Sequence, residues 1–374
     1  MKRILLLSTV HPPTDPRIFY KIAPALAEKY EVICVTPGAP KISGNTFKSY
    51  PVPFFKKLLP RILVSHPAVL WKCLVLRPDM VHIFVPELIP VALVLQCFGI
   101  KIVYEVQENL YKKFSIKTYN NGALFKKLFR YFDDLARQKF RLIFTEKAYL
   151  NEYSEMKYPF SIIQNFAKLQ LIDSFTDTPK KMMVPEFFYT GVISIERSFD
   201  VMVAAFSELK IRYPYFHLHL FGPVRISDKI ISTLPGFNHI RENLTFYGYS
   251  DQRIAFRNAS GCIAGIALLK PVGDYPDSYT TKLFEYMALK LPVITSDFPS
   301  YREIVEPSQS GFCICPYNSK LLLEKLVFLI ENEKERSEMG KRGRACVENY
   351  YNWQTECEKL LAFYASIVSP VNVI

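Results

Sequence analysis

The sequence lacks the short motifs that mark several large enzyme classes. It contains no Gly-x-Gly-x-x-Gly fingerprint, no Walker phosphate loop and no Asp-x-Asp metal motif. These absences argue against a nicotinamide enzyme, a P-loop NTPase and a metal-dependent transferase. Low-complexity tracts and repeats at solenoid spacing are also missing, which excludes solenoids and propellers. We therefore expect a compact, globular fold.

Cysteine is present, but the sequence does not cluster it. The eight cysteines are scattered, and the close pair Cys313 and Cys315 lies in an apolar, strand-like run. No group of cysteines and histidines has the spacing of a zinc site. We expect no metal site, and buried structural thiols in a reducing compartment.

Long apolar runs are also missing from the sequence. The longest, 88–100, falls short of the ~20 residues that cross a bilayer. The start of the chain resembles a signal peptide for a few residues, but its apolar run ends at His11 without a small-residue cleavage site. We expect a first strand there and a cytoplasmic protein.

The positive charge is confined to one half of the chain. Lys and Arg outnumber Asp and Glu by 24 to 12 over residues 1–165, whereas each pair numbers 23 over 166–374, which accounts for the totals of 47 and 35. The net charge of +12 therefore belongs to the N-terminal half. Such asymmetry indicates an anionic partner for that half, either nucleic acid or anionic lipid.

The length of 374 residues exceeds what one hydrophobic core usually supports, so two domains are expected. Short apolar runs alternate with helical patterns in both halves, which is typical of parallel α/β sheets. The expected strands are 4–9, 32–36, 80–84, 102–106 and 142–145, followed by 187–190, 217–221, 244–247, 262–266, 292–295 and 312–314. The expected helices are 15–29, 87–99, 121–139, 198–213, 251–258, 280–289, 318–333 and 335–349.

These signals indicate an α/β protein with two Rossmann-like domains facing across a cleft. We place the domains at 1–167 and 185–351, with a polar linker over about 168–185. A last helix over 352–374, which Asn352 can cap, is expected to complete the N-terminal domain. Ligands bind such sheets at the carboxyl ends of the strands.

The segment 277–288 is the most informative part of the sequence. Ser278 or Thr280 can cap a helix whose first turn holds Lys282 and whose next turn holds Glu285 on the same face. A helix start with an ammonium group suits a diphosphate, and a carboxylate one turn on suits a ribose diol. The alternative is a common Lys–Glu pair on the surface, which the spacing alone favours.

The same segment, with 291–295, resembles the P-T-K-L-F-E-Y-M-A-x-G-x-P-V-I signature of retaining GT-B glycosyltransferases of family four. Residues 188–191 with Glu196 and Arg197 resemble the Y-x-G-x-I-S-x-x-R-G turn of that family. Residues 11–18 resemble its H-P-x-x-D-x-R-I loop, and 78–82 with 86–88 resemble its D-x-x-H-x-H-D-P-E-L motif. The likeness extends over nearly the whole chain and implies a GT-B fold.

The resemblance implies roles for several residues of the donor site. Arg197 and Lys282 would hold the donor diphosphate, and Glu285 the ribose. Gly191 and Thr281, which belong to the two matching motifs, are further donor-binding candidates.

Two acidic residues have open alternatives. Asp277 stands at the first acidic position of the family's E-x7-E pattern and would contact the donor sugar, or it is a solvated carboxylate at a helix cap. Glu303 resembles an acidic position near the cleft, or it pairs with Arg302 on the surface.

The first half departs from the family pattern at one important position. Gln107 stands where the family often has histidine, and Glu105 replaces an aspartate. Glutamine can hydrogen-bond a sugar hydroxyl but cannot accept a proton as a base. A front-face displacement, in which the leaving phosphate oxygen takes the acceptor proton, is less affected by this change. His82, within an apolar strand pattern, is either catalytic or part of the core.

The resulting hypothesis is a hexosyltransferase that moves a sugar from a UDP- or GDP-linked donor to a glycan or polyprenyl-linked acceptor, with retention. It would need neither cofactor nor metal and would act in bacterial-type surface polysaccharide synthesis. The alternatives are an epimerase on the same fold and a non-catalytic protein that binds nucleotide sugars. No nucleic-acid recognition motif accompanies the basic half.

Two segments of the basic half mix cations with large apolar side chains. One is 54–63 with Trp71 and Lys72 close behind, and the other is 124–132. In the second, apolar residues recur at helical spacing, and Lys126, Lys127 and Arg130 lie off that stripe: Phe125, Leu128, Phe129 and Phe132. We expect these segments to dock on an anionic membrane at the inner face, unless the stripe packs on the sheet.

Overall fold

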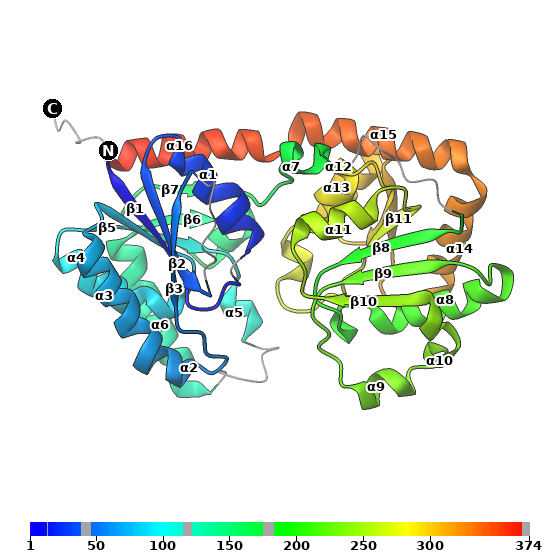
Figure 1. Cartoon of the computed structure of the whole chain (residues 1–374), viewed down its shortest axis with the longest axis horizontal. Helices are drawn as coiled ribbons and strands as arrows, with labels where there is room; N and C mark the ends of the chain where they lie inside the picture. Colours follow the sequence, from blue (N-terminus) through cyan, green and yellow to red (C-terminus); the bar gives the residue numbers. More distant parts are fainter. Residues whose placement is uncertain (13, 39–45, 115–121, 175–182, 369–374) are drawn as a thin grey trace. The chain divides into compact units, whose positions relative to one another are not determined.

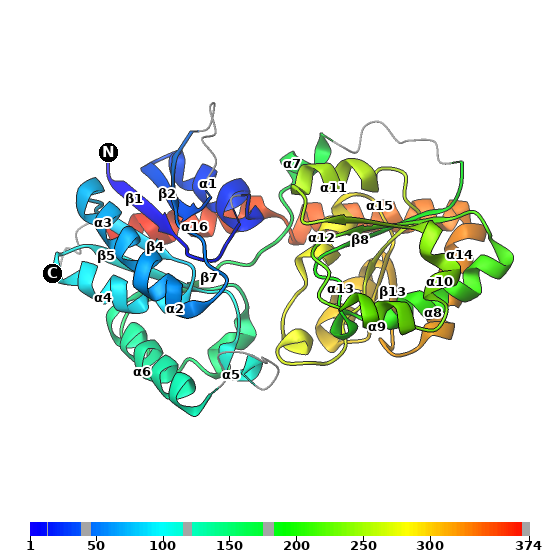
Figure 2. The same cartoon turned by 60° about the horizontal axis from the view of Figure 1, so that its bottom comes forward.

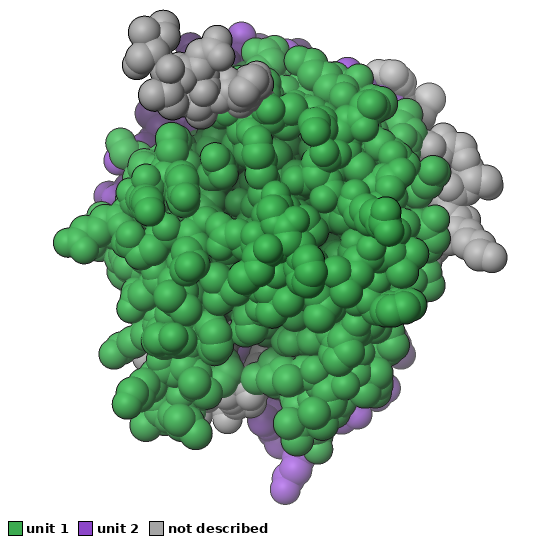
Figure 3. Space-filling view, turned by 90° about the vertical axis from the view of Figure 1, so that its left-hand side faces the viewer, with its two compact units in different colours: residues 1–165, 354–374 green, residues 166–353 purple. Residues whose placement is uncertain are grey.

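The computed structural model describes residues 1–12, 14–38, 46–114, 122–174 and 183–368. The chain divides into two compact units, which Figure 3 colours separately. Unit 1 comprises Met1–Asn165 with Gln354–Ile374, and unit 2 comprises Phe166–Trp353. The chain thus leaves unit 1 once and returns to it at its end.

Unit 1 is built on a seven-stranded sheet in which every neighbouring pair is parallel. Its order is β3-β2-β1-β4-β5-β6-β7, and both faces are covered by helices, so the central strands are apolar along their length. The strands are β1 (Arg3–Leu7), β2 (Glu31–Pro37), β3 (Lys48–Val52), β4 (Met80–Ile83), β5 (Lys101–Val106), β6 (Arg141–Phe144) and β7 (Phe160–Ile162).

The helices of unit 1 lie in two layers (Figure 1). One face of the sheet carries α3 (His66–Leu76), α4 (Ile89–Cys97) and α6 (Ala123–Lys139), and the other carries η1 (Ile18–Ile22), α1 (Ala23–Ala27) and α16 (Trp353–Val368). Shorter elements are α2 (Leu58–Pro60), η2 (Arg61–Ser65), η3 (Pro86–Leu88), α5 (Leu110–Lys113) and η4 (Lys147–Asn151).

Unit 2 has a six-stranded parallel sheet in the order β10-β9-β8-β11-β12-β13. Its strands are β8 (Glu186–Thr190), β9 (His217–Phe221), β10 (Leu244–Gly248), β11 (Ala264–Ala267), β12 (Val293–Ser296) and β13 (Gly311–Ile314). The strand order reverses between β8 and β11, so ligands are expected outside the carboxyl ends of these strands.

Two helical layers cover this second sheet as well (Figure 2). One layer is formed by α8 (Phe199–Arg212), α9 (Asp228–Thr233), α10 (Phe237–Ile240) and α14 (Ser319–Glu331). The other is formed by α7 (Leu169–Asp173), α11 (Gln252–Ala259), α12 (Thr281–Ala288), α13 (Pro299–Ser308) and α15 (Glu333–Tyr350). The 3-10 turns are η5 (Ile195–Arg197), η6 (Arg241–Asn243) and η7 (Tyr275–Asp277).

The predicted α/β class with two parallel sheets is confirmed. Sequence patterns missed β3, an edge strand that contains Pro51, because proline marks a turn more often than a strand. They also missed α13, which begins at Pro299 and contains Pro307. Residues 169–173, assigned to the linker, form α7, and an ion pair of 2.6 Å between Asp173 and Arg344 ties α7 to α15. Residues 175–182 of that linker lie outside the described residues.

One helical run of the described chain, Leu58–Leu76, is long and apolar enough to cross a membrane by length and composition. It has 19 residues with a mean hydropathy of 1.3, and 28% of the run is buried. The run joins α2, η2 and α3, and it was missed because apolar residues surround the helix on all sides without a 3.6-residue period.

The returning helix α16 is fastened to unit 1 by a buried hydrogen bond. The Tyr364 hydroxyl lies 2.6 Å from Nδ1 of His82, and both side chains are fully buried. His82 is therefore a core residue, as one of its two interpretations held. On its other side, Nε2 lies 3.6 Å from Glu105, which accepts two hydrogen bonds from Arg17 at 2.7 and 3.0 Å.

The burial of His82 predicts that the protein loses stability in acid. Burial lowers the pKa of His82 to about 4, with Glu105 opposing the shift and Arg17 adding to it. The imidazole of the unfolded chain titrates near pH 6.5. The free energy of unfolding is therefore highest above that pH and decreases as pH falls toward 4, because the unfolded chain binds a proton that buried His82 does not. The loss amounts to about 3 kcal/mol, measured by urea unfolding at successive pH values.

The double variant His82→Phe with Tyr364→Phe removes both hydrogen-bonding partners. It should flatten the pH dependence between 6.5 and 4 while keeping most of the stability at neutral pH. Tyr364→Phe alone should cost about 1–3 kcal/mol, because it leaves the buried imidazole unsatisfied. An unchanged acid slope in the double variant would contradict the assignment.

Candidate functional site

Three glycines stand at the carboxyl ends of neighbouring strands of unit 2. Gly191, Gly222 and Gly248 follow or end β8, β9 and β10, and their φ angles are 119°, 141° and 66°. A Cβ on Gly222 would lie 2.0 Å from the Gly191 carbonyl oxygen, so this close approach of two backbones requires glycine. The edge of the sheet where ligands are expected is therefore bare backbone.

Helix α12 is docked beside this edge by Tyr286. The ring fills the space that a side chain on Gly265 would occupy, since a Cβ there would lie 2.2 Å from the ring. Its hydroxyl accepts a hydrogen bond of 2.7 Å from the Thr190 backbone N–H, at the end of β8. Because Lys282 lies one turn before Tyr286, this contact brings the start of α12 to Gly191.

Two cations converge on Gly191. A Cβ on this glycine would lie 2.7 Å from Nη1 of Arg197 and 3.8 Å from Nζ of Lys282. Arg197 comes from η5, directly after the β8 loop, and Lys282 from the first turn of α12. The structure thus brings together three residues that were predicted from separate motifs.

Lys282 is buried without a hydrogen-bond acceptor. The residue is 5% exposed, and within the described part of the chain its Nζ has no hydrogen-bond partner. It lies over the Tyr189 ring, 4.3 Å from the centroid. Burial and then repulsion by Arg197 hold the pKa of Lys282 well below its usual range, against the attraction of Glu285. Such a group is costly unless an anion joins it.

Arg197 differs from Lys282 in having tyrosine partners. Its guanidinium lies 5.8 Å from the centroid of the Tyr275 ring, and Tyr189 is also close enough to interact with its charge. Burial works against the charge, but the two tyrosines raise the pKa of Arg197 above its ordinary value. This cation is held in place before any ligand arrives.

Glu285 lies on the same helix, 7% exposed. Its carboxylate accepts a hydrogen bond from Gln252, the first residue of α11. Since Lys282 and Glu285 are both buried, the interpretation of these two residues as a surface ion pair is wrong. Gln252 orients the carboxylate, a contact between distant segments that spacing could not predict.

The start of α12 differs in one respect from the expected cap. Thr281 is the first helical residue and Thr280 the N-cap, but the Thr280 side chain makes no capping hydrogen bond. Ser278 donates its hydroxyl to the Asp274 carbonyl instead. The predicted side-chain cap is therefore wrong.

The remaining acidic candidates lie in unit 2, and both are exposed. Asp277 ends η7, while the neighbouring Asp274 of the same loop is buried. Glu303 is on α13. The pKa of Tyr351 is raised mainly by burial, and the charge of Glu303 adds to this shift. Arg302 pairs with Asp297 and, at 3.8 Å, with Glu306.

Gln107 belongs to unit 1, at the carboxyl end of β5. Its amide donates a hydrogen bond of 2.7 Å to the Glu105 carboxylate, which also binds Arg17. The hydrogen-bonding character expected of Gln107 is thus directed at a buried carboxylate of its own unit. Its second role, toward a sugar, stays a prediction.

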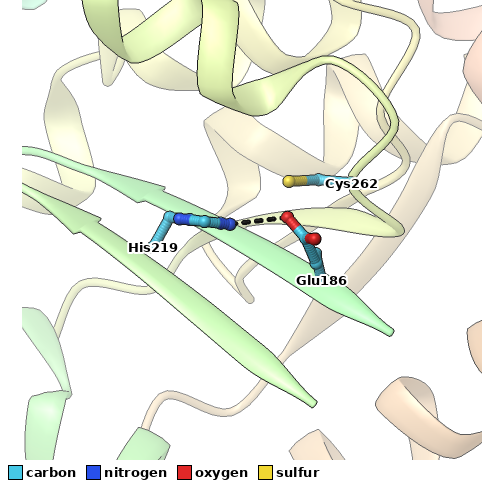
Figure 4. Close-up of side chains that lie close together, drawn as sticks. All are labelled: Glu186, His219 and Cys262. Atoms are coloured by element: carbon cyan, nitrogen blue, oxygen red, sulfur yellow. Dashed lines mark hydrogen bonds and ion pairs between the residues drawn. The ribbon is translucent and has the colours of Figure 1, made fainter. Parts of the chain in front are cut away.

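A second group of polar residues lies on the sheet of unit 2, away from the glycines (Figure 4). Ligand atoms of Glu186, His219 and Cys262 lie within 4.8 Å of one another. The ring nitrogens of His219 are 2.7 Å from Glu186 and 2.9 Å from the Tyr247 hydroxyl. These hydrogen bonds satisfy the imidazole and account for the arrangement.

Comparison with known proteins agrees with the geometry of unit 2. The family model "Glycosyl transferases group 1" matches residues 172–345. Spore coat protein SA of Bacillus subtilis is 33% identical over 82 residues, 22% of each chain. The poly(ribitol-phosphate) alpha-N-acetylglucosaminyltransferase of Staphylococcus aureus is 23% identical over 151 residues, 40% of this chain and 29% of its own. CapM, a capsular polysaccharide biosynthesis glycosyltransferase of Staphylococcus aureus, is 34% identical over 80 residues, 21% of each chain. The matches span less than a third of the length of these relatives.

Solved structures resemble the whole chain. Sucrose-phosphate synthase from Thermosynechococcus elongatus has a TM-score of 0.77 at 17% identity, with 98% of this chain and 99% of that chain covered. Anabaena HepE in complex with UDP-glucose has a TM-score of 0.71 at 13% identity, with 98% and 100% covered. At this identity the likeness shows the fold, and the motifs around Arg197 and Lys282 lie within the matched family region. Residues 172–345 thus match the group 1 glycosyltransferases, and the whole chain has the fold of GT-B glycosyltransferases.

Proposed function

We propose that the chain is a retaining hexosyltransferase that takes its sugar from a UDP- or GDP-linked donor. The observation that carries this proposal is the buried ammonium of Lys282, which has no acceptor and stands with Arg197 beside the bare backbone of Gly191. A diphosphate would satisfy both cations and neutralise the buried charge. The positive end of the helix dipole at the start of α12 favours the same ligand.

The two cations suit the chemistry of a departing diphosphate. In the reaction the bond between the anomeric carbon and the phosphate oxygen breaks, and the electron pair stays with the diphosphate. The acceptor hydroxyl attacks on the same face, and its proton passes to the departing phosphate oxygen. Negative charge grows on the diphosphate during this step, so Lys282 and Arg197 stabilise the transition state more than the bound donor.

Positive charge from the chain itself supports a metal-independent donor site. Arg197 and Lys282 supply two charges within reach of one diphosphate, and Glu285 with Gln252 offers a fixed carboxylate for a ribose diol. We therefore propose that donor binding requires no divalent ion. Thr281 at the helix start completes this donor site.

The relatives favour a glycan acceptor and a UDP-linked donor. CapM acts in capsular polysaccharide biosynthesis, and HepE has been solved with UDP-glucose. By analogy, we propose an acceptor that is a glycan or a lipid-linked glycan of a bacterial surface polysaccharide. An epimerase or a non-catalytic nucleotide-sugar binder would share the donor site but would not form a new glycosidic bond.

The proposal is tested by thermal shift with UDP and GDP, followed by hydrolysis of UDP-glucose. At a hundred times its dissociation constant, the correct nucleotide should add about 2.7 kcal/mol of stability. Slow release of glucose should accompany binding, since a catalyst transfers to water at a low rate. Stabilisation without hydrolysis would favour the non-catalytic alternative.

Lys282→Met should separate stability from binding. Removing a buried ammonium without an acceptor should raise the free protein's stability by on the order of 1–3 kcal/mol, while the stabilisation by UDP is lost. The matched control is Lys21→Met, because Lys21 is also buried but donates to Asn165 at 2.7 Å. The control should destabilise the protein and keep the response to UDP. Lower stability in both variants would contradict a ligand-binding role for Lys282.

Glu285→Gln should weaken nucleotide affinity by about ten- to a hundredfold, measured by calorimetry. The amide replaces one acceptor oxygen of a charged group, which is worth about 1.5–3 kcal/mol. The exposed Glu303→Gln is the control and should bind UDP normally. Equal losses of nucleotide affinity in the two variants would indicate that Glu303 also contributes to the donor site.

At a pH above the lowered pKa of free Lys282, where its side chain is partly neutral, donor binding should also take up a proton. Because the pKa of free Lys282 is well below its usual range and a diphosphate favours the ammonium form, affinity for UDP should fall as pH rises above the free-state pKa. Calorimetry in two buffers of different ionisation enthalpy measures the proton directly. In Lys282→Arg the uptake should disappear, since arginine stays charged. Equal uptake in that variant would assign the proton to another group.

A further inference from the structure

Unit 1 exposes a large apolar surface along the run Leu58–Leu76 and the neighbouring helix α4. We call it the apolar face. Its two most exposed members are Trp71, at 68%, and Phe98, at 66%. The side chains that form it are Phe54, Leu59, Ile62, Leu63, Val64, Trp71, Leu74, Val75, Val94 and Phe98. Soluble proteins rarely leave so many large apolar groups together in water without a partner.

The segments 54–76 and 94–98, which form the apolar face, carry no acidic residue, although Asp79, paired with Lys2, lines the same hollow as Phe98. No Asp or Glu occurs between Glu31 and Asp79, or between Glu87 and Glu105. The cations on the run include Lys56 and Lys57 at its start and Lys72 near its middle, where Nζ lies 5.2 Å from the centroid of the Tyr50 ring. Protein interfaces are depleted in lysine at their core, whereas apolar groups flanked by lysine suit an anionic lipid surface.

The run is fastened to the sheet by its inner side. Val69 and Cys73 are fully buried in the core of unit 1. Arg61 donates two hydrogen bonds of 2.8 Å to Glu87, one to each carboxylate oxygen. Burial would raise the pKa of Glu87, but hydrogen bonds from His66, Arg61 and Thr9 lower it to about 2. The run therefore lies on the surface of unit 1, although its length would allow it to cross a bilayer.

The second basic segment behaves differently from the expectation. Phe125 and Phe129 of α6 pack edge-on against the ring of Phe114, and Phe129 is buried. Three of the four stripe residues, Phe125, Phe129 and Phe132, thus pack against the protein, as the alternative interpretation held, whereas Leu128 is 48% exposed. The exposed side of α6 carries Leu124, Leu128 and Tyr131, with Lys127 and Arg130 between them.

Helix α6 nevertheless extends the apolar face. Helix α3 contacts α4, and α4 contacts α6. Figure 2 shows these three helices along one side of unit 1. No acidic residue occurs between Glu108 and Asp133, so residues 123–132 of α6 carry only positive charges, while Asp134 is exposed further along the helix. We propose that the apolar face docks on a bilayer that contains anionic lipid, with η2 and α3 lying in the plane of the interface and Trp71 inserted.

This inference stands apart from the donor site, because the apolar face belongs to unit 1 and the donor residues to unit 2. A lipid-bound acceptor would gain from it, but membrane binding is measured without any nucleotide. Failure of one proposal therefore leaves the other intact.

Co-sedimentation of the full chain with vesicles tests the proposal. Vesicles of phosphatidylcholine alone are compared with vesicles that also contain phosphatidylglycerol. We expect binding only with the anionic lipid and a clear loss of binding as salt is raised. Each cation near such a surface contributes about fivefold in affinity, so Lys56→Glu, Lys57→Glu and Lys72→Glu together should weaken binding by about a hundredfold or more.

The matched control changes the same charge on unit 2, with Lys229→Glu, Lys320→Glu and Lys334→Glu at exposed positions. It should keep most of the binding. A second pair, Leu63→Ser with Trp71→Ser, removes exposed apolar groups and should weaken binding at least tenfold with unchanged thermal stability and unchanged affinity for UDP.

Three results would overturn the proposal. One is equal binding to both kinds of vesicle, or none. Another is an equal loss in the control triple, which would mean that net charge alone attracts the vesicles. The third is a dimer in light scattering that Leu63→Ser with Trp71→Ser converts to a monomer, which would identify a second copy of the chain as the occupant of the face.

Discussion

The amino group of Lys282, buried without an acceptor among the described residues, is the constraint around which the edge of unit 2 is arranged. Its position follows from Tyr286. The Tyr286 ring occupies the space that a side chain on Gly265 would fill, and its hydroxyl accepts a hydrogen bond from the Thr190 backbone N–H at the end of β8. Gly191 then leaves room for Arg197, and its φ of 119° disfavours any residue with a side chain. Gly191, Gly265 and Tyr286 thus fix the Lys282 side chain in a buried position.

Other buried charges show what is unusual about this one. In unit 1, Arg17 is bound to Glu105, Arg61 to Glu87, and Lys21 to Asn165. Each of those pairs closes a contact between segments distant in the sequence and serves the fold. Lys282 contacts the Tyr189 ring but has no hydrogen-bond acceptor among the described residues, and this difference is the basis for proposing a ligand at this position.

Sequence patterns predicted the two sheets well because buried parallel strands leave continuous apolar runs. They failed where proline occurs in a regular element, as Pro51 does in β3 and Pro307 in α13. They predicted the helix of α6 but not the direction of its apolar side, since the partner ring of Phe114 belongs to another element. The cations and Glu285 were predicted from their motifs. The missing acceptor of Lys282 and the contact from Gln252 depend on packing between distant segments, which spacing does not encode.

The return of the chain to unit 1 has a consequence for synthesis. Unit 2 is one continuous segment and can complete its core as soon as it has left the ribosome, whereas unit 1 needs α16, which is made after unit 2. Until then Tyr364 cannot reach His82, and one face of the first sheet is covered only by η1 and α1. The part of the protein that is translated first is therefore the last to reach its final fold, and its apolar strands depend on protection from aggregation for the whole time that unit 2 is being made.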